Sequence, residues 1–296
     1  RGGNLPVPHT LIRVEDGFLR SIGLGADMER PLSLALDTVG IYYDSRRPSA
    51  LERLLAKHPF DERLLERAAR LRQRIVSEKL TKYNLADQGW TRPETGKRVL
   101  LVPGQVEHDA SIRHGSPRIK TNLHLLRTVR AAYPQAHIVY KPHPDVVAGL
   151  REAGSDESRA HLESDEVVTA GSIVGMLDQV DEVHTLTSLT GFEALMRGKS
   201  VTCYGQPFYS GWGLTTDHLP IERRGRRLSL DALVAGCLIL YPTYVSRTTG
   251  RFITPEQAVE ALVAWRDAYA GTPYLRRKAL RLERWLLSGL RALRRG

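Results

Sequence analysis

The pattern of apolar and polar positions divides the chain into two regions that differ in the spacing of their apolar residues. In the first region, apolar runs at 11–14 and 33–43 are typical of strands, and residues 49–83 carry leucines at helical spacing. A polar segment with glycine and proline follows at 84–98. Such a segment is typical of a connector, so it predicts a domain boundary.

Beyond this boundary, short apolar runs alternate with helical patterns, which indicates a parallel, doubly wound sheet. Strands are expected at 99–104, 136–142, 180–187 and 200–205, and helices at 121–133, 191–199, 228–240 and 254–269. The predicted organisation is an N-terminal domain (1–90), a Rossmann-like donor domain (97–240), a closing helix (241–270) and a tail (271–296).

Four conspicuous segments each follow a predicted strand of the second region. They are VPGQVEHDAS (102–111), KPHPD (141–145), TLTSLTGFE (185–193) and YGQPFYSGWG (204–213). Ligands of parallel sheets bind at the carboxyl ends of the strands. Their shared position therefore predicts a single site.

The last of these segments is dense in aromatic residues, with Tyr204, Phe208, Tyr209 and Trp212 in one glycine-containing loop. Rigid aromatic faces offer contact area to a ring, and glycines let backbone approach a ligand. The loop is equally compatible with an aromatic plug at a domain interface. The residues alone leave both interpretations open.

Two of the segments suit an anion. In KPHP, two prolines hold Lys141 and His143 at a strand end, an arrangement that fits a phosphate or a rigid turn. In TLTSLTGFE, Ser188 and Thr190 begin a helix, whose free amides bind anions or are simply capped. Gly191 favours close approach of a ligand, and Glu193 is placed to accept from ribose hydroxyls.

Carboxylates occur in both regions. Glu107 and Asp109 follow the strand at 99–104, and Glu15 and Asp16 precede Gly17 in the first region. Two carboxylates facing across a cleft suit glycosyl transfer, although a polar loop and an Asp-Gly turn would look the same. The chain has no Asp-x-Asp triplet, P-loop or GxGxxG fingerprint, so we expect neither a metal nor a cofactor.

Composition narrows the class further. The 296 residues are 42% hydrophobic and 26% charged, as in soluble globular proteins, and no apolar run reaches the length of a membrane span. Cys203 and Cys237 lie in apolar runs, which predicts buried thiols in a reducing compartment. Without a signal peptide or an initiator methionine, the chain is interpreted as an excerpt of a longer polypeptide.

The net charge of +10 is concentrated at the C-terminus. Residues 275–296 hold eight basic residues against Glu283, so binding of nucleic acid by the whole molecule is poorly supported. The leucines of this tail recur at helical spacing beside Trp285, which predicts a basic amphipathic helix on an anionic membrane. A helix that packs its leucines on the protein is the alternative.

Together, these motifs resemble the modules of KpsC-type capsule polysaccharide β-Kdo transferases, in order, from about Leu11 to Ala268. The resemblance also rests on SLALDTVGIYYDSRRPS (33–49) and LYPTYVSRTTG (240–250). It implies a GT-B-like α/β fold with two Rossmann-like domains around a cleft, the first one incomplete here. It further implies transfer of Kdo from CMP-β-Kdo onto a Kdo-bearing (lyso)phosphatidylglycerol glycolipid, with retention of anomeric configuration.

The resemblance also implies roles for individual residues. His143 and Pro144 match the family's HP motif, Glu15, Asp16 and Gly17 its acidic motif, and Asp109 its acid after the glutamine. Asp109 is then the nucleophile and Glu15 the base, with His143 assisting. The family often has Asp at the position of His108, and its modules begin some tens of residues before Glu15.

The full assignment has two further groups. The acceptor side comprises Asp16, Gly17, Arg20 and Ser21. The donor side comprises Gln105, Ser111, Lys141, Pro144, Ser188, Thr190, Gly191, Glu193, Tyr209, Trp212 and Gly213.

The expected setting is the cytoplasmic face of a bacterial inner membrane, with other capsule assembly proteins as partners and no nucleic acid. Two other functions stay open: an inverting, sialyltransferase-like CMP-sugar transferase with Glu15 or Asp16 as the sole base, and a non-catalytic membrane-docking module.

Overall fold

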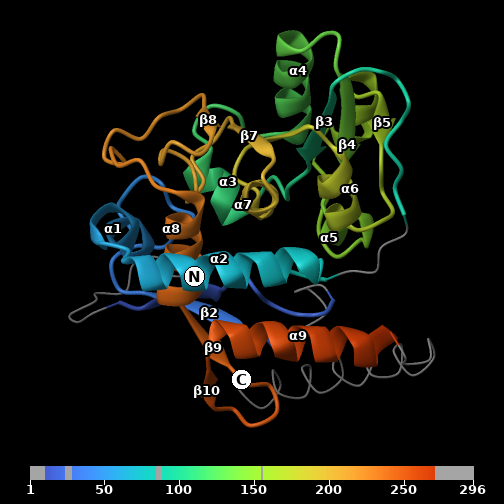
Figure 1. Ribbon diagram of the computed structural model, residues 1–296. Coiled ribbons are helices and arrows are strands. Elements are labelled where there is room, and N and C mark those ends of the chain that lie inside the picture. The colour runs from blue at the N-terminus through green and yellow to red at the C-terminus, as the bar shows by residue number, and fades with distance from the viewer. Residues whose placement is uncertain (1–10, 24–28, 85–88, 155, 271–296) are drawn as a thin grey trace, which may run out of the picture.

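The computed structural model describes residues 11–23, 29–84, 89–154 and 156–270. Two sheets organise it, with a parallel sheet and its helices across the upper half of Figure 1 and a smaller sheet beside the long helices α2 and α9 below. The tail predicted at 271–296 lies outside the described residues.

The larger sheet has six parallel strands in the order β5-β4-β3-β6-β7-β8. They are β3 (Val99–Pro103), β4 (His137–Lys141), β5 (Glu166–Val167), β6 (Glu182–Thr185), β7 (Ser200–Cys203) and β8 (Thr216–Asp217). The order reverses between β3 and β6, so the crevice that binds ligands in such sheets is expected at their carboxyl ends. The predicted parallel α/β sheet is confirmed.

Short helices connect these strands. They are α3 (Ala110–Gly115), α4 (Asn122–Ala132), α5 (Pro144–Val147), a 3-10 turn (Glu157–Leu162), α6 (Ile173–Gln179) and α7 (Leu189–Met196). Side chains cap several of them: Thr121 caps α4, Ser172 caps α6 and Ser188 caps α7. These caps fix where each helix begins, next to the strand that precedes it.

The smaller sheet is antiparallel, in the order β1-β2-β9-β10. Its strands are β1 (Arg13–Asp16), β2 (Ser33–Asp37), β9 (Pro242–Val245) and β10 (Phe252–Ile253). The sequence predicted only a closing helix over 241–270, but the structure places β9 and β10 there before α9 (Pro255–Ala270). The chain thus returns to complete the sheet with which the described part begins.

Four helices cover this sheet and join the two halves. They are α1 (Ala50–Lys57), α2 (Glu62–Ser77), α8 (Leu230–Val234), which continues as a π-helix (Ala235–Leu240), and α9. Helix α2 packs against α8 and α9, and ion pairs fasten it: Arg72 to Asp231 at 2.8 Å and Arg67 to Glu256 at 2.8 Å. One hydrophobic core runs from Ala35 of the small sheet to Leu101 of the large one, so the halves pack as one body.

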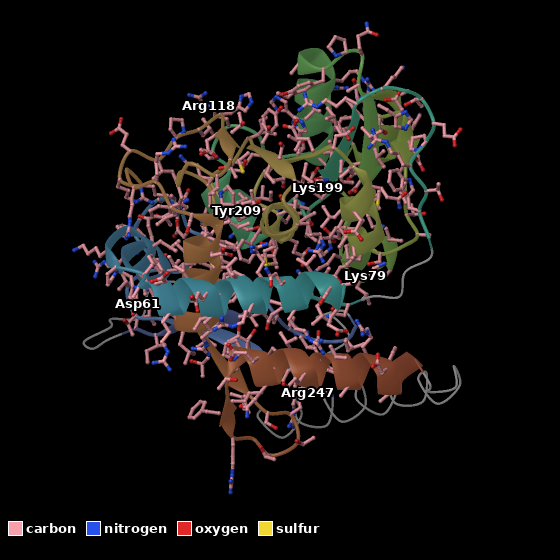
Figure 2. All side chains as sticks on the ribbon, in the orientation of Figure 1. Asp61, Lys79, Arg118, Lys199, Tyr209 and Arg247 are labelled. Carbon is pink, nitrogen blue, oxygen red and sulfur yellow. The ribbon has the colours of Figure 1, made fainter. Side chains whose placement is uncertain are left out.

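Side chains fill the space between the sheets, with Tyr209 in the interior (Figure 2). Cys203 and Cys237 are buried free thiols, as the sequence predicts. Over the described ranges, no helix is long and apolar enough to cross a bilayer.

Candidate active site

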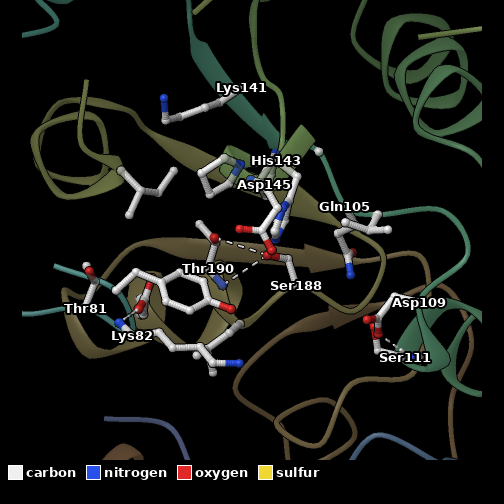
Figure 3. Close-up of a pocket in the computed structure, with 18 of the residues that line it drawn as sticks. Thr81, Lys82, Gln105, Asp109, Ser111, Lys141, His143, Asp145, Ser188 and Thr190 are labelled. Atoms are coloured by element: carbon white, nitrogen blue, oxygen red, sulfur yellow. Dashed lines mark hydrogen bonds between the residues drawn. The ribbon is translucent and has the colours of Figure 1, made fainter. Parts of the chain in front are cut away.

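A cavity of about 760 Å³ lies where the two sheets meet. The end of β1 and residues 81–83 line it from one side, and the loops after β3, β4 and β6 from the other (Figure 3). Twelve residues predicted from the sequence line it. They are Glu15, Asp16, Arg20, Gln105, Asp109, Ser111, Lys141, His143, Pro144, Ser188, Thr190 and Glu193.

Asp109 is the N-cap of α3 and is exposed at the cavity wall. Its Oδ1 accepts a hydrogen bond of 2.8 Å from the Ser111 amide, as Figure 3 shows. This bond orients the carboxylate, and Oδ2 has no hydrogen-bond partner among the described residues. Neighbouring His108 is exposed and does not line the cavity.

Across the cavity, Glu15 and Asp16 end strand β1. Asp16 is paired with Arg20, whose Nε lies 2.5 Å from Oδ2, so its charge is compensated. Burial raises the pKa of Glu15; the Asp16 amide and Lys82 oppose the rise, and the Asp16 and Asp109 carboxylates add to it. Glu15 therefore has the environment of a proton acceptor.

His143 caps the short helix α5, because its Nδ1 accepts from the Asp145 amide at 3.1 Å. A neutral imidazole in this position carries its proton on Nε2. Burial lowers the pKa of His143, which favours that neutral form. The residue can thus donate a hydrogen bond into the cavity without a net charge.

Lys141 ends β4 and is largely buried. Its ammonium donates to the carbonyls of Val168 at 3.4 Å and Ala170 at 3.1 Å. Burial lowers the pKa of Lys141. This cation is anchored by backbone oxygens on the donor side of the cavity.

Residues at the ends of β3 and β6 are tied together. The Gln105 side chain donates to Thr187 Oγ1 at 3.0 Å and accepts from the Thr187 amide at 2.9 Å. After this tie, Ser188 caps α7 by accepting from the Thr190 amide. Gln105 thus holds the two loops in register, and the Ser188 and Thr190 hydroxyls face the cavity (Figure 3).

Glu193 lines the cavity from α7 and also joins it to the first region. Its Oε1 accepts from the Lys82 amide at 2.9 Å. Burial raises the pKa of Glu193. One carboxylate oxygen is therefore committed to the fold rather than to a ligand.

The sequence assigned Tyr209, Trp212 and Gly213 to the donor, but the structure does not bring them into the cavity. Tyr209 and Trp212 are fully buried, with the Tyr209 hydroxyl bonded to the Ser188 carbonyl at 2.5 Å and Trp212 Nε1 to the Phe208 carbonyl at 2.9 Å. The loop is therefore an interior plug. Of its aromatic residues, only Phe208 reaches the cavity wall.

Three other predicted residues are also structural rather than exposed to a ligand. A Cβ at Gly17 would meet the Ser33 side chain, and one at Gly191 would meet the Tyr209 hydroxyl. Ser21 is fully buried and donates to the Gly23 carbonyl at 2.9 Å. Close packing by protein, not by a ligand, explains these two glycines.

Sequence reasoning missed several residues that line the cavity, among them Tyr43, Lys82 and Asp145. Asp145 is part of the KPHPD motif, so its place in the cavity lining could have been predicted from the sequence. Tyr43 lies within the run 33–49, on which the resemblance rests, but no role was assigned to it, and Lys82 lies in an irregular segment with no motif. Burial raises the pKa of Tyr43, and Glu15 and Asp109 add to this effect.

Among the described residues, no group of three or more His, Cys, Asp or Glu side chains could hold a metal ion.

The sequence matches the family model described as capsule polysaccharide biosynthesis protein, over residues 9–92 and 62–252. It is 51% identical over 253 residues to the capsule polysaccharide modification protein LipA of Neisseria meningitidis, covering 86% of this chain and 36% of that protein. It is 46% identical over 257 residues to the lipopolysaccharide-processing protein LpsZ of Rhizobium meliloti, covering 85% and 58%. The chain thus spans about a third of the LipA length.

Two solved structures are also similar, both of KpsC from Thermosulfurimonas dismutans. The β-Kdo 2,7 transferase is 45% identical with a TM-score of 0.74, covering 88% of this chain and 80% of that one. The β-Kdo 2,4 transferase is 36% identical with a TM-score of 0.79, covering 86% and 79%. The predicted GT-B-like α/β class is confirmed with one parallel, Rossmann-like sheet, whereas the sheet of the first region, expected to be Rossmann-like as well, is antiparallel.

Proposed function

We propose that this chain, which belongs to the capsule polysaccharide biosynthesis protein family, is a retaining glycosyltransferase. It would transfer Kdo from CMP-β-Kdo to a Kdo-bearing (lyso)phosphatidylglycerol glycolipid. One observation carries the proposal: Glu15 and Asp109, from different sheets, line the same cavity. The similar solved structures of Kdo transferases support the choice of sugar.

The first step is a displacement at C2 of the donor. Oδ2 of Asp109 attacks C2 while the bond from C2 to the phosphate oxygen breaks, and CMP leaves with the electron pair. We expect His143 Nε2–H, Lys141 and the Ser188 and Thr190 hydroxyls, all from residues that line the cavity, to stabilise the departing phosphate. CMP carries a single phosphate rather than a diphosphate, so we expect these groups to stabilise it without a metal.

The second step regenerates Asp109. Glu15 removes the proton of the acceptor hydroxyl, whose oxygen attacks C2 as the bond to Asp109 breaks. Two inversions give net retention. We expect the ribose to lie beside Glu193 and the cytosine beside Phe208, because both residues line the cavity. Tyr209 and Trp212 are buried and cannot contact the cytosine.

The inverting alternative is favoured by one observation. Asp109 already serves as the cap of α3, a role that requires no chemistry. In that case Glu15 would act alone as base, and the product would have the opposite anomeric configuration.

Product analysis tests the proposal. The chain is incubated with CMP-Kdo generated in situ and a synthetic Kdo glycolipid, followed by intact-mass spectrometry and product NMR. We expect a β-Kdo product and a protein mass increased by one Kdo when acceptor is omitted. An α-linked product would support the inverting alternative, and binding of CMP without any turnover would support a non-catalytic module. The same NMR spectrum distinguishes a 2→4 from a 2→7 linkage.

A further inference from the structure

Lys82 is a cation that lines the cavity and whose ammonium has no polar partner among the described residues. It lies in the segment between α2 and β3, and its backbone amide is fixed by Glu193 at 2.9 Å. Its ammonium lies 5.4 Å from the centre of the Tyr83 ring. Within the described residues, no hydrogen bond or ion pair reaches this ammonium, and its side chain runs along the crevice in Figure 3.

The other cations that line the cavity are differently placed. Arg20 is paired with Asp16 at 2.5 Å, and Lys141 donates to two backbone carbonyls. Arg151 follows α5 and is exposed. Among these cations, Lys82 is thus the one that is half-buried and whose ammonium has no hydrogen-bond partner in the described residues.

Lys82 faces the part of the cavity where the chemistry is proposed. Lys82, Glu15, Asp109 and His143 all line this cavity, and Lys82 and Asp109 both influence the pKa of Glu15 and of His143. Burial alone would lower the pKa of Lys82, but Tyr83, Asp16 and Glu15 outweigh it, and the pKa is raised. The ammonium therefore stays charged at neutral pH.

This position meets a need of the substrate class. A 2-ulosonic acid such as Kdo bears a carboxylate on the carbon that reacts. An Asp109 carboxylate that approaches this carbon is repelled by the neighbouring carboxylate, and Glu15 adds a further negative charge. A lysine ammonium beside both would offset the repulsion and orient the sugar.

We propose that Lys82 binds the C1 carboxylate of the transferred sugar and so aligns its C2 with Asp109. The inference rests on the proposed function, because it names the part of the donor that Lys82 recognises. Phosphate and carboxylate share the same chemistry toward an ammonium, so the experiment must separate them.

The first test measures the donor half-reaction without acceptor, in which Glu15 has no proposed part. CMP release from CMP-Kdo generated in situ is followed for wild type, Lys82→Met and Lys82→Arg, alongside CMP affinity by calorimetry. For Lys82→Met we expect the KM for CMP-Kdo to rise about 10- to 100-fold, the loss of one charge-assisted hydrogen bond, with CMP affinity within threefold of wild type. Arginine should restore most of the loss.

Lys97→Met is the matched control, since Lys97 is exposed in the connector before β3. It should change neither quantity. Thermal unfolding of each variant shows whether the fold is kept. A parallel loss of CMP affinity in Lys82→Met would mean that Lys82 binds the phosphate and would overturn the proposal, as would an unchanged KM.

A second measurement requires no turnover. The methyl β-glycoside of Kdo and its C1 carboxamide are titrated into the protein saturated with CMP. Wild type should prefer the carboxylate about 10- to 100-fold, and Lys82→Met should lose this preference. A preference retained in Lys82→Met would refute the role of Lys82. A wild type that shows the preference but releases no CMP from CMP-Kdo would refute the proposed function alone.

Discussion

At the residue scale, Asp109 combines two roles that a substitution can separate. Asparagine caps a helix as well as aspartate does, so Asp109→Asn should keep the bond to the Ser111 amide and the stability of α3. It removes the nucleophile. We expect transfer to fall by about three orders of magnitude or more, with CMP affinity nearly unchanged.

Single-turnover transfer rates and CMP calorimetry check this prediction, and intact-mass spectra should no longer show the Kdo adduct. If the Asp109→Asn protein transfers Kdo within tenfold of the wild-type rate, the double displacement is wrong.

Glu15 links activity to pH. Burial raises its pKa above the ordinary value of 4.5, and transfer needs the ionised form. Activity should therefore rise with pH through this raised pKa, so the acid limb of kcat/KM should lie above that expected for an exposed glutamate. Glu15→Gln should remove both the limb and most of the transfer.

Glu15 should also lower the stability of the folded protein at neutral pH, where its carboxylate is ionised. Because the folded state holds the Glu15 proton more tightly than the unfolded chain, the protonated carboxyl contributes stability below the ordinary pKa of 4.5 that is lost as pH rises through the raised value. Glu15→Gln should thus raise the free energy of unfolding at pH 7, measured by denaturant titration. A Glu15→Gln protein less stable than wild type at pH 7 would contradict this sign.

Single residues of the site differ in how far the sequence could predict them. Glu15, Asp109 and His143 stand in motifs at strand ends, and all three line the cavity. Gly191 and Trp212 stand in equally conspicuous motifs but are packed by protein, because a motif does not tell whether the neighbour of a glycine or a ring is a ligand or a side chain.

At the scale of elements, the parallel sheet could be predicted because short strand-like segments, most clearly the apolar run Val99–Pro103, alternate with helical patterns. The antiparallel sheet could not. Strand β9 has four residues and β10 two, and β9 pairs with β2, more than 200 residues earlier. Such short strands carry no clear period, and their partner is not encoded locally.

The interior loop after β7 depends on a buried ion pair. Arg224 Nε lies 2.8 Å from Glu52 of α1, and its guanidinium also donates to the carbonyls of Pro207 and Ser210 at 2.5 and 2.9 Å. Both side chains are less than a tenth exposed. Arg224→Met leaves Glu52 buried, with Arg223 as its remaining partner, and should cost about 3–5 kcal/mol of unfolding free energy.

Arg70→Met is the comparison, since the Arg70–Glu66 pair on α2 is exposed at 67% and 59% and should contribute under about 1 kcal/mol. Denaturant unfolding of both variants measures the difference. Equal losses would mean that Arg224 does not hold the loop that places Phe208 at the cavity wall.

At the scale of the whole molecule, the two sheets share one core, yet a cavity with charged side chains in its lining lies between them. The proposed acceptor is a glycolipid, whose sugar must reach Glu15 while its chains stay in the membrane. A protein that acts on it needs an attachment to the bilayer surface. The tail at 275–296, with eight basic residues and leucines at helical spacing, is our candidate from the sequence.

Removing this tail should release the protein from anionic membranes. We expect the full chain to co-sediment with phosphatidylglycerol vesicles and to be displaced by salt, because several basic residues each contribute about 1 kcal/mol near an anionic surface. A chain that ends at Tyr269 should stay in the supernatant, and its unfolding transition should match that of the full chain, since Arg266 of α9 keeps its ion pair with Glu78 at 3.2 Å. Phosphatidylcholine vesicles are the control and should bind neither protein strongly. Equal sedimentation of both chains with phosphatidylglycerol, or binding by the full chain that salt leaves unchanged, would mean that the tail packs its leucines on the protein instead.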